Sequence, residues 1–327
     1  MLQARHGLAV DGLVSARVVL ANGTAVTASS TSHPDLFWAL KGAGHNFGIL
    51  TSLQLKVYDI QSNWTVHAFI YSTDKLEAVL DVVNAVDGNA TRPVNLVIAG
   101  VSLRILDIDP NNPVVVYTIS YEGTEAEAAP YFAYFQAIGP IVVQPATDVD
   151  YVSLYTVTQN SLDSIACTRN KNAMGSGASL PVWNTTAALF LLENYGMQGV
   201  RAVDASSTSL SLEERQYPII ANLTIWWEGI AAKDTADAMA YGEQIRQAFF
   251  AGLPAGAKKH TYVNYAVGTE GFNQMYGYDA PRVNKLKALK KRLDPKNRFG
   301  YCIMFPWYRV ILFTQMPDHW MVYKAFV

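Results

Sequence analysis

A glycine-rich stretch between a helical pattern and a strand pattern constrains the fold of this chain more than any other feature. Residues 35–41 (DLFWALK) predict one or two helical turns, residues 42–48 (GAGHNFG) follow, and residues 49–57 predict a strand. A dinucleotide-binding loop needs G-x-G-x-x-G after a strand and before a helix. Here the spacing is G-x-G-x-x-x-G and the order is reversed, so a Rossmann fold is excluded. A P-loop is excluded because no Gly-Lys-Ser/Thr follows.

Two interpretations of this stretch follow from its residues. Glycine permits positive φ and lets the backbone approach a ligand closely, which favours a binding site. The same glycines are typical of a tight helix-to-strand turn that contacts no ligand. The residues alone leave both interpretations open.

Strand and helix patterns are mixed along the rest of the chain, with many antiparallel signals, and predict an α+β fold. The pair Asn22-Gly23 is a strong hairpin signal, and Thr124 with Glu127 fits a capping box ahead of Pro130. Strands are predicted at 14–20, up to Val26, and at 49–57, 64–70, 96–106, 114–121 and 221–227, and helices at 76–83, 233–250 and 283–293.

Composition limits the classes of function. The chain has 327 residues, 50% of them hydrophobic, and a net charge of −2. This length predicts roughly two domains, and the near-neutral charge predicts no nucleic-acid partner. No apolar run approaches the roughly 18 residues of a membrane span. The six histidines lack metal-ligand spacing, so no metal site is expected, and no G-x-S-x-G elbow indicates a serine hydrolase.

The ends of the chain and its sequons suggest a secretory origin. Five N-x-Ser/Thr sequons occur where chance gives about two, while residues 1–14 contain no signal-peptide pattern. We therefore expect a chain that begins late in a secreted glycoprotein. Cys167 and Cys302 could form one bridge or remain two buried thiols, and the apolar residues 308–327 form a tail of uncertain origin. The sequons are at Asn22, Asn63, Asn89, Asn184 and Asn222.

A second candidate site lies at residues 262–265 (YVNY). As a strand, this segment would place Tyr262 and Asn264 on one face and Val263 and Tyr265 on the other. The first face could offer hydrogen bonds to a planar heterocycle. The alternative is a sheet with buried tyrosines whose hydroxyls are satisfied internally.

These motifs together resemble a known family. Residues 35–49 are similar to the D-L-F-W-A-[LI]-[RK]-G-G-G-x-N-F-G-[VI] segment of oxygen-dependent FAD-linked oxidases, the berberine-bridge-enzyme-like proteins with a vanillyl-alcohol-oxidase-type (PCMH-type) flavin domain. Residues 6–14 resemble the family's H-G-L-A-x-D-N-L stretch, with Gly12 where Asn is usual. Residues 262–265, 276–277 and 282–299 resemble its Y-x-N-Y, Y-G and R-L-x-x-L-K-x-x-x-D-P-x-N-x-F elements.

The resemblance implies a flavin oxidase with two domains and an antiparallel sheet flanked by helices in the substrate domain. Residues 1–58 would belong to the FAD-binding domain, 59–260 to the substrate domain and 261–307 to a returning segment. FAD would accept a hydride from an alcohol, sugar or secondary-metabolite substrate and pass electrons to O2. The residues expected at the cofactor are Gly42, Gly44, Asn46, Phe47, Gly48, Ile49, Tyr262 and Asn264.

Departures from the family pattern weaken the expected cofactor site. The family's pyrophosphate loop and the residues that bond covalently to flavin normally precede the segment at His6, and neither His6 nor Cys167 is expected to replace them. Ala43 and His45 stand where the family has glycines. We therefore expect an N-terminally truncated chain that binds FAD weakly or not at all, whereas the full-length family member would be secreted.

The catalytic base is harder to predict. The strand 221–227 would direct Asn222 and Thr224 inward, but neither is a strong base, and Glu228 is expected in a solvated turn. Tyr265 is the candidate base. The first hypothesis is thus an oxidase active only with its missing N-terminal half. The alternative is a non-catalytic protein or incomplete gene model that retains only the substrate-domain fold.

Overall fold

The computed structural model describes residues 2–88, 92–161, 172–180, 191–227 and 232–300. Its mixture of helices and antiparallel strands confirms the predicted α+β class. The strands are β1 (Leu13–Val19), β2 (Ala25–Ser29), β3 (Ile49–Leu55), β4 (Trp64–Ser72), β5 (Leu96–Leu103), β6 (Val114–Glu122), β7 (Val142–Val149), β8 (Asn172–Leu180), β9 (Leu191–Asn194) and β10 (Ile219–Trp227). The helices are α1 (Gln3–His6), α2 (Pro34–Ala43), α3 (Leu76–Asp87), α4 (Glu125–Gln136), α5 (Leu154–Val157), α6 (Gln198–Ala202), α7 (Leu212–Gln216), α8 (Ala232–Ala251), α9 (Phe272–Tyr276) and α10 (Ala280–Leu293).

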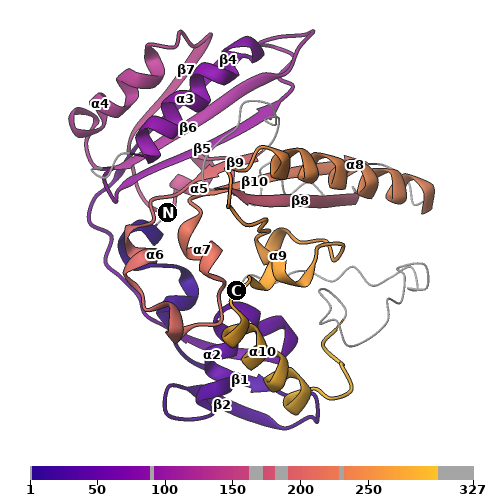
Figure 1. The fold of residues 1–327 in the computed structure, drawn as a ribbon. Helices are drawn as coiled ribbons and strands as arrows, with labels where there is room; N and C mark the ends of the chain where they lie inside the picture. The colour runs from indigo at the N-terminus through magenta and orange to yellow at the C-terminus, as the bar shows by residue number, and fades with distance from the viewer. Residues whose placement is uncertain (1, 89–91, 162–171, 181–190, 228–231, 301–327) are drawn as a thin grey trace.

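The strands form two antiparallel sheets. A three-stranded sheet has the order β2-β1-β3, and a seven-stranded sheet has the order β7-β4-β6-β5-β9-β10-β8. Figure 1 shows the larger sheet with α3 and α4 along its upper part and α8 beside β10 and β8. The smaller sheet lies at the opposite end with α2 and α10.

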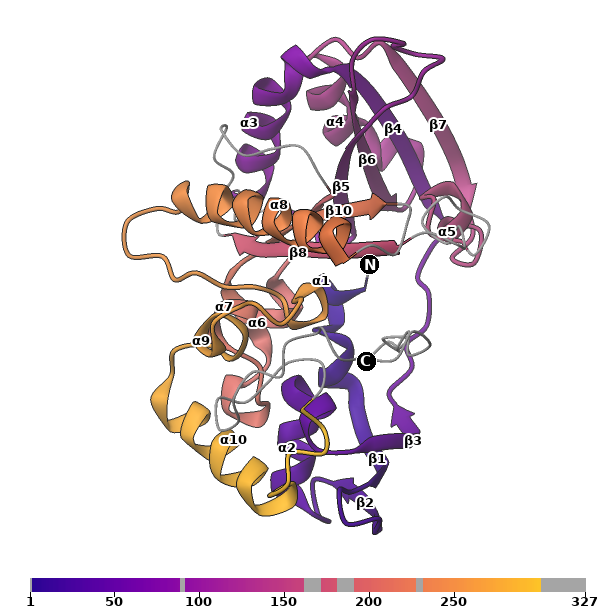
Figure 2. The ribbon, with the colours of Figure 1, turned by 90° about the vertical axis from the view of Figure 1, so that its right-hand side faces the viewer.

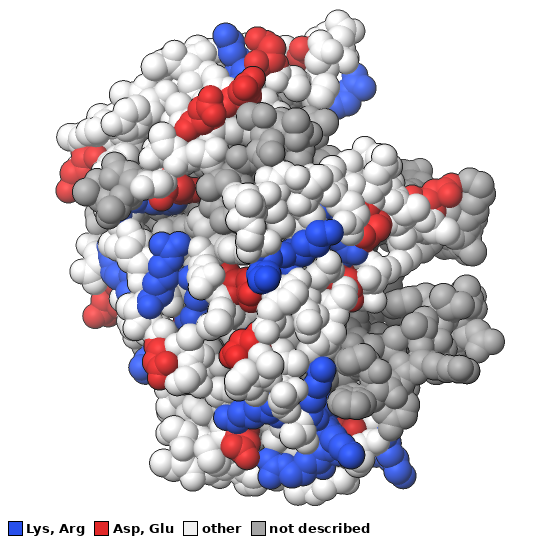
Figure 3. Space-filling model, viewed as in Figure 1, with Lys and Arg blue, Asp and Glu red and all other residues white. Residues whose placement is uncertain are grey.

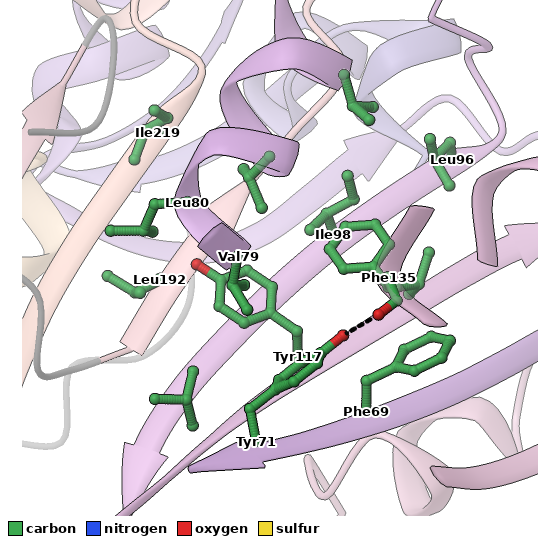
Figure 4. Close-up of a cluster of buried hydrophobic side chains, with 14 of the residues drawn as sticks. Phe69, Tyr71, Val79, Leu80, Leu96, Ile98, Tyr117, Phe135, Leu192 and Ile219 are labelled. Carbon is green, nitrogen blue, oxygen red and sulfur yellow. Dashed lines mark hydrogen bonds between the residues drawn. The ribbon is translucent and has the colours of Figure 1, made fainter. Parts of the chain in front are cut away.

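The main core fills the space between the larger sheet and its helices. The apolar side chains of α3 recur at i, i+3, i+4 and i+7, so one face of the helix is buried on the sheet. Figure 4 shows this cluster, in which the Tyr71 hydroxyl donates a hydrogen bond of 2.8 Å to the carbonyl oxygen of Phe135. Burial in this core raises the pKa of the Tyr71 phenol, which stays neutral at physiological pH.

A second core joins the two ends of the described chain. Side chains from the first fifty residues, including Phe37 and Phe47, pack with Met275, Tyr276 and Leu286 from the last described helices. Figure 2 shows α10 lying beside α2 and the three-stranded sheet. Basic side chains gather where α10 lies (Figure 3). Those in its last turn stabilise the helix, because their positive charge interacts favourably with the negative end of the helix dipole.

Local turn and cap signals were predicted correctly. Gly23 has φ +85° in the β1–β2 hairpin, and the amide of Thr24 donates to Asn22 Oδ1. The Thr124–Glu127 capping box begins α4, which contains Pro130. Two strands are shorter than predicted, because β3 ends at Leu55 and β5 ends at Leu103.

Two predictions about strands were wrong. Residues 262–265 do not form a strand: Val263–Tyr265 is a 3₁₀ turn, η6, closed by a hydrogen bond from the Tyr265 amide to the Tyr262 carbonyl. Three strands, β7, β8 and β9, were not predicted at all. Since β9 has only four residues, it is too short for its alternation to stand out from a loop. Cys167, Glu228, Cys302 and residues 308–327 lie outside the described residues.

Candidate active site

Two glycines of the glycine-rich stretch pack closely against other parts of the chain. Gly42 ends the regular part of α2 with φ +142°, and a Cβ added there would lie 2.5 Å from the backbone nitrogen of Leu210. A Cβ on Gly48 would lie 2.5 Å from Val18 Cγ1 in β1. Both positions therefore require glycine because of internal packing, whatever else the stretch does.

The polar side chains of this stretch are also directed inward. Asn46 is fully buried and donates from Nδ2 to the Tyr276 hydroxyl at 2.8 Å, and that hydroxyl lies 2.8 Å from His45 Nε2. The Lys290 ammonium donates to the Asn46 carbonyl oxygen at 2.8 Å. Phe47 is fully buried, whereas Ile49 is 60% exposed at the start of β3. Of the predicted cofactor residues, Phe47 belongs to the second core and Asn46 is buried against Tyr276, whereas Tyr262 and Asn264 belong to the segment around η6.

The second predicted site brings two tyrosines together at η6. The rings of Tyr262 and Tyr265 meet edge to face with centroids 5.5 Å apart, and Asn264 Nδ2 donates to the Tyr262 hydroxyl at 2.6 Å. The alternation expected of a strand would have put Tyr265 on the opposite face from Tyr262. Instead, the 3₁₀ turn places both rings on the same side.

A carboxylate that the sequence analysis missed completes this site. Glu193 of β9 accepts a hydrogen bond on Oε2 from the Tyr265 hydroxyl at 3.0 Å. Its Oε1 accepts another from the Tyr195 hydroxyl at 2.6 Å. We call Glu193, Tyr195, Tyr262 and Tyr265 the tyrosine–glutamate cluster. All four side chains are half-buried. Tyr195 and Tyr265 are 70 positions apart in the sequence, so no local pattern could have predicted that they lie together.

Burial and negative charge hold the three tyrosines of the cluster in their neutral form. Burial, followed by the charges of Glu214 and Glu193, raises the pKa of Tyr262 to about 12. Burial and then Glu193 raise the pKa of Tyr265 and of Tyr195 well above the usual value. Each hydroxyl therefore keeps its proton at physiological pH, and those of Tyr195 and Tyr265 donate theirs to Glu193.

The register of the larger sheet places Asn222 on the same face as Glu193. Ile220 of β10 lies opposite Glu193 of β9, and Asn222 follows two residues later, so both point to one side. Asn222 is buried, with 3% of its surface exposed. Thr224 lies on the same strand, and Glu228, the third residue considered as a base, is outside the described part of the chain.

A neighbouring group resembles a nucleophilic triad without its geometry. Ser211 Oγ lies 3.4 Å from His260 Nε2, and Glu214 Oε1 lies 2.7 Å from the same nitrogen. A relay through imidazole needs the acid and the nucleophile on different ring nitrogens. This arrangement therefore gives no support to acyl transfer.

Comparison with known proteins identifies relatives over most of the chain. No family model matches. The FAD-linked oxidoreductase anuG of Penicillium roqueforti is 30% identical over 323 residues, and the FAD-linked oxidoreductase OXR2 of Pyricularia oryzae is 33% identical over 330 residues. Each match covers 91% of this chain and 62% of the relative.

Over most of its length the chain is similar to FAD-linked oxidoreductases. The family predicted from the glycine-rich stretch and its companion motifs is thereby confirmed. The chain spans less than two thirds of the length of these two oxidoreductases.

Solved structures show that the described chain has the berberine-bridge-enzyme-like fold. The moss (Physcomitrella patens) BBE-like 1 variant D396N superposes with a TM-score of 0.72 at 20% identity, covering 90% of this chain and 65% of that one. The xylooligosaccharide oxidase of Myceliophthora thermophila gives a TM-score of 0.70 at 21% identity, covering 92% and 67%. At these identities the likeness concerns the fold alone.

The described residues fit an FAD pyrophosphate poorly at two of the three glycines of the glycine-rich stretch. Gly42 and Gly48 have their open sides filled by Leu210 and Val18, whereas a Cβ on Gly44 would meet only Leu40 Cδ2, at 3.6 Å. The tyrosine–glutamate cluster instead offers hydroxyl and carboxylate groups suited to a substrate. Within the described ranges, no helix is long and apolar enough to cross a membrane, and no three His, Cys, Asp or Glu side chains gather as a metal site.

Proposed function

We propose that this chain is the substrate-binding part of an FAD-dependent oxidase that converts an alcohol carbon of a sugar or secondary metabolite to a carbonyl. The observation that supports the proposal is the hydrogen bond between Tyr265 and Glu193, a phenol and a carboxylate joined in a half-buried cluster. FAD, named in the relatives, would supply the two-electron oxidation and the transfer of electrons to O2.

Tyr265 and Glu193 would act together as the base. Because its pKa is raised, Tyr265 is protonated and cannot take a second proton unless it gives one away. As the Tyr265 oxygen accepts the proton of the substrate hydroxyl, the phenolic proton would move along the 3.0 Å hydrogen bond to Glu193. The proton released by the alcohol thus ends on Glu193, and Tyr265 stays neutral.

We further propose that residues 1–58 and 261–307 form one domain and residues 59–260 mainly the other. The shared core of Phe47 and Tyr276 supports this division for the described part. The division is not strict, because Trp38 Nε1 donates to the Ser206 carbonyl oxygen at 3.0 Å. The phosphate contacts of FAD would come from the length of the relatives that this chain does not span.

The test is an oxidase assay of the full-length protein that contains this chain, with FAD and a panel of sugars and other alcohols, in which H2O2 and carbonyl product are both measured. We expect one H2O2 per carbonyl, and a rate at least about 100-fold lower in Tyr265→Phe and in Glu193→Gln. Tyr134→Phe, which alters an exposed tyrosine on α4, is the matched control. Full activity of Tyr265→Phe would contradict the assigned base, and absence of any oxidation would favour a non-catalytic chain.

A further inference from the structure

The tyrosine–glutamate cluster holds a negative charge that no described cation balances. The carboxylate of Glu193 accepts hydrogen bonds from two neutral phenols, and no ion pair among the described residues includes it. Three other buried or half-buried carboxylates differ in this respect, although the buried Glu213 also has no ion pair among the described residues. Asp11 pairs with Arg215, Glu270 with Arg246, and Asp294 with Lys290.

The nearest second carboxylate adds to this charge. Glu214 acts on Tyr262 and raises its pKa, as Glu193 does on all three tyrosines of the cluster. Glu214 has a partner of its own in His260, at 2.7 Å, whereas the partners of Glu193 among the described residues are hydroxyls. The field inside the cluster is therefore negative, and an anionic ligand would be repelled.

The aromatic rings have the arrangement of two walls of a cage. Tyr262 and Tyr265 stand nearly perpendicular, at 89°, with centroids 5.5 Å apart. The faces of tyrosine rings carry negative potential and attract a cation within about 6 Å of the centroid. Rings and carboxylate together suit a large, weakly hydrated cation. A metal ion fits less well, because neutral phenols are poor ligands and Glu193 is the single acid that accepts from them.

We propose that the tyrosine–glutamate cluster binds an organic cation, a protonated or quaternary amine carried by the substrate. This inference rests on the proposed function and narrows its substrate class from alcohols in general to amino alcohols. The cation would complete the charge balance of Glu193.

The test compares two ligands of the same shape in the chain without FAD. Choline carries a trimethylammonium group, and 3,3-dimethylbutan-1-ol carries a neutral tert-butyl group in its place. We expect isothermal titration calorimetry to give at least about tenfold tighter binding of choline, since cation–aromatic and carboxylate contacts act only on the charged ligand. Choline keeps its charge at every pH, so protonation does not complicate the comparison.

Variants test whether the preference for choline over the neutral alcohol depends on the tyrosine–glutamate cluster. Glu193→Gln keeps the shape of the side chain and should reduce the preference for choline to about twofold or less, and Tyr262→Leu should weaken choline binding about tenfold while leaving the alcohol unchanged. Glu77→Gln, at an exposed position of α3, is the matched control. Circular dichroism would establish that each variant folds. Tyr265→Phe, which keeps the ring, serves as a second variant and should retain the preference.

Two results would overturn the proposal: equal binding of the two ligands, including no binding of either, or a choline preference that Glu193→Gln leaves intact. Both measurements are made without FAD and without turnover. Failure here would therefore leave the oxidase proposal standing, and failure of the oxidase assay would leave the cation site standing.

Discussion

The glycine-rich stretch and the tyrosine–glutamate cluster differ in the partners of their polar groups. In the first, the Asn46 carbonyl oxygen accepts from Lys290, and that ammonium also pairs with Asp294 at 2.7 Å. In the second, the charge of Glu193 meets only hydroxyl groups, and its side chain stays half-buried. The polar groups of the first region are paired with a cation of the chain itself, whereas Glu193 in the second is paired with no cation among the described residues.

The difference shows that a recognisable sequence motif can reflect close packing, while the residues of a polar site need not form a motif. A stretch such as 42–48 is recognisable because close packing of Gly42 and Gly48 permits few other residues there. The cluster depends on residues from β9 and η6 that meet only after folding. Three experiments sharpen this comparison, beginning with the one for which we expect the largest effect.

Gly42→Ala should be the most destabilising change. The added methyl group would lie 2.5 Å from the Leu210 nitrogen, and φ of +142° is unfavourable for alanine. Strain and overpacking together predict a loss of about 3–5 kcal/mol in the free energy of unfolding, measured by urea denaturation. The matched control is Gly23→Ala at φ +85°, where no atom lies within 4 Å of the added Cβ.

The control isolates backbone strain from packing. Because only the conformational cost remains at Gly23, we expect Gly23→Ala to lose about 1 kcal/mol. Equal losses in the two variants would mean that the contact with Leu210 carries no energy. In that case the glycine-rich stretch would be free to serve a ligand.

Removing one hydroxyl from each region should give unequal effects on stability. Tyr276→Phe takes a fully buried partner from both His45 and Asn46, and should cost about 1–3 kcal/mol. Tyr265→Phe removes a half-exposed bond to Glu193 and should cost under about 1 kcal/mol. Thermal unfolding of the two variants measures both. A larger loss of stability in Tyr265→Phe than in Tyr276→Phe would show that the main role of the cluster is to stabilise the fold.

Much of the fold was predictable because its signals are local. The Asn22-Gly23 turn, the Thr124 cap and the amphipathic face of α3 each depend on residues within one or two turns of chain. The order of the seven strands was not predictable, since β9 pairs on one side with β5, 92–96 positions away, and on the other with β10, 25–31 positions away.

The candidate site was predicted only in part for the same reason. Tyr262, Asn264 and Tyr265 carried a recognisable motif, yet their faces were assigned wrongly because a strand was assumed where a 3₁₀ turn forms. Glu193 had no signal, because a single glutamate in a four-residue strand has the same pattern as a glutamate in a loop. Its role follows only from the hydroxyls that surround it.

The smallest effect concerns the alkaline limit of stability. Since the folded-state pKa of Tyr262 is raised from 10 to about 12, folding favours the protonated phenol. This contribution is complete below pH 10 and is lost as the pH rises toward 12, so stability falls with pH in that window. Tyr262→Phe removes the titration, and its stability should fall less steeply, by up to about 1.4 kcal/mol per pH unit. Urea denaturation between pH 9.5 and about 11.5 would measure both slopes, with Tyr134→Phe as the control. Identical slopes would mean that Tyr262 is solvated like a surface tyrosine, and the cluster would then lack the burial that distinguishes it from the rest of the protein surface.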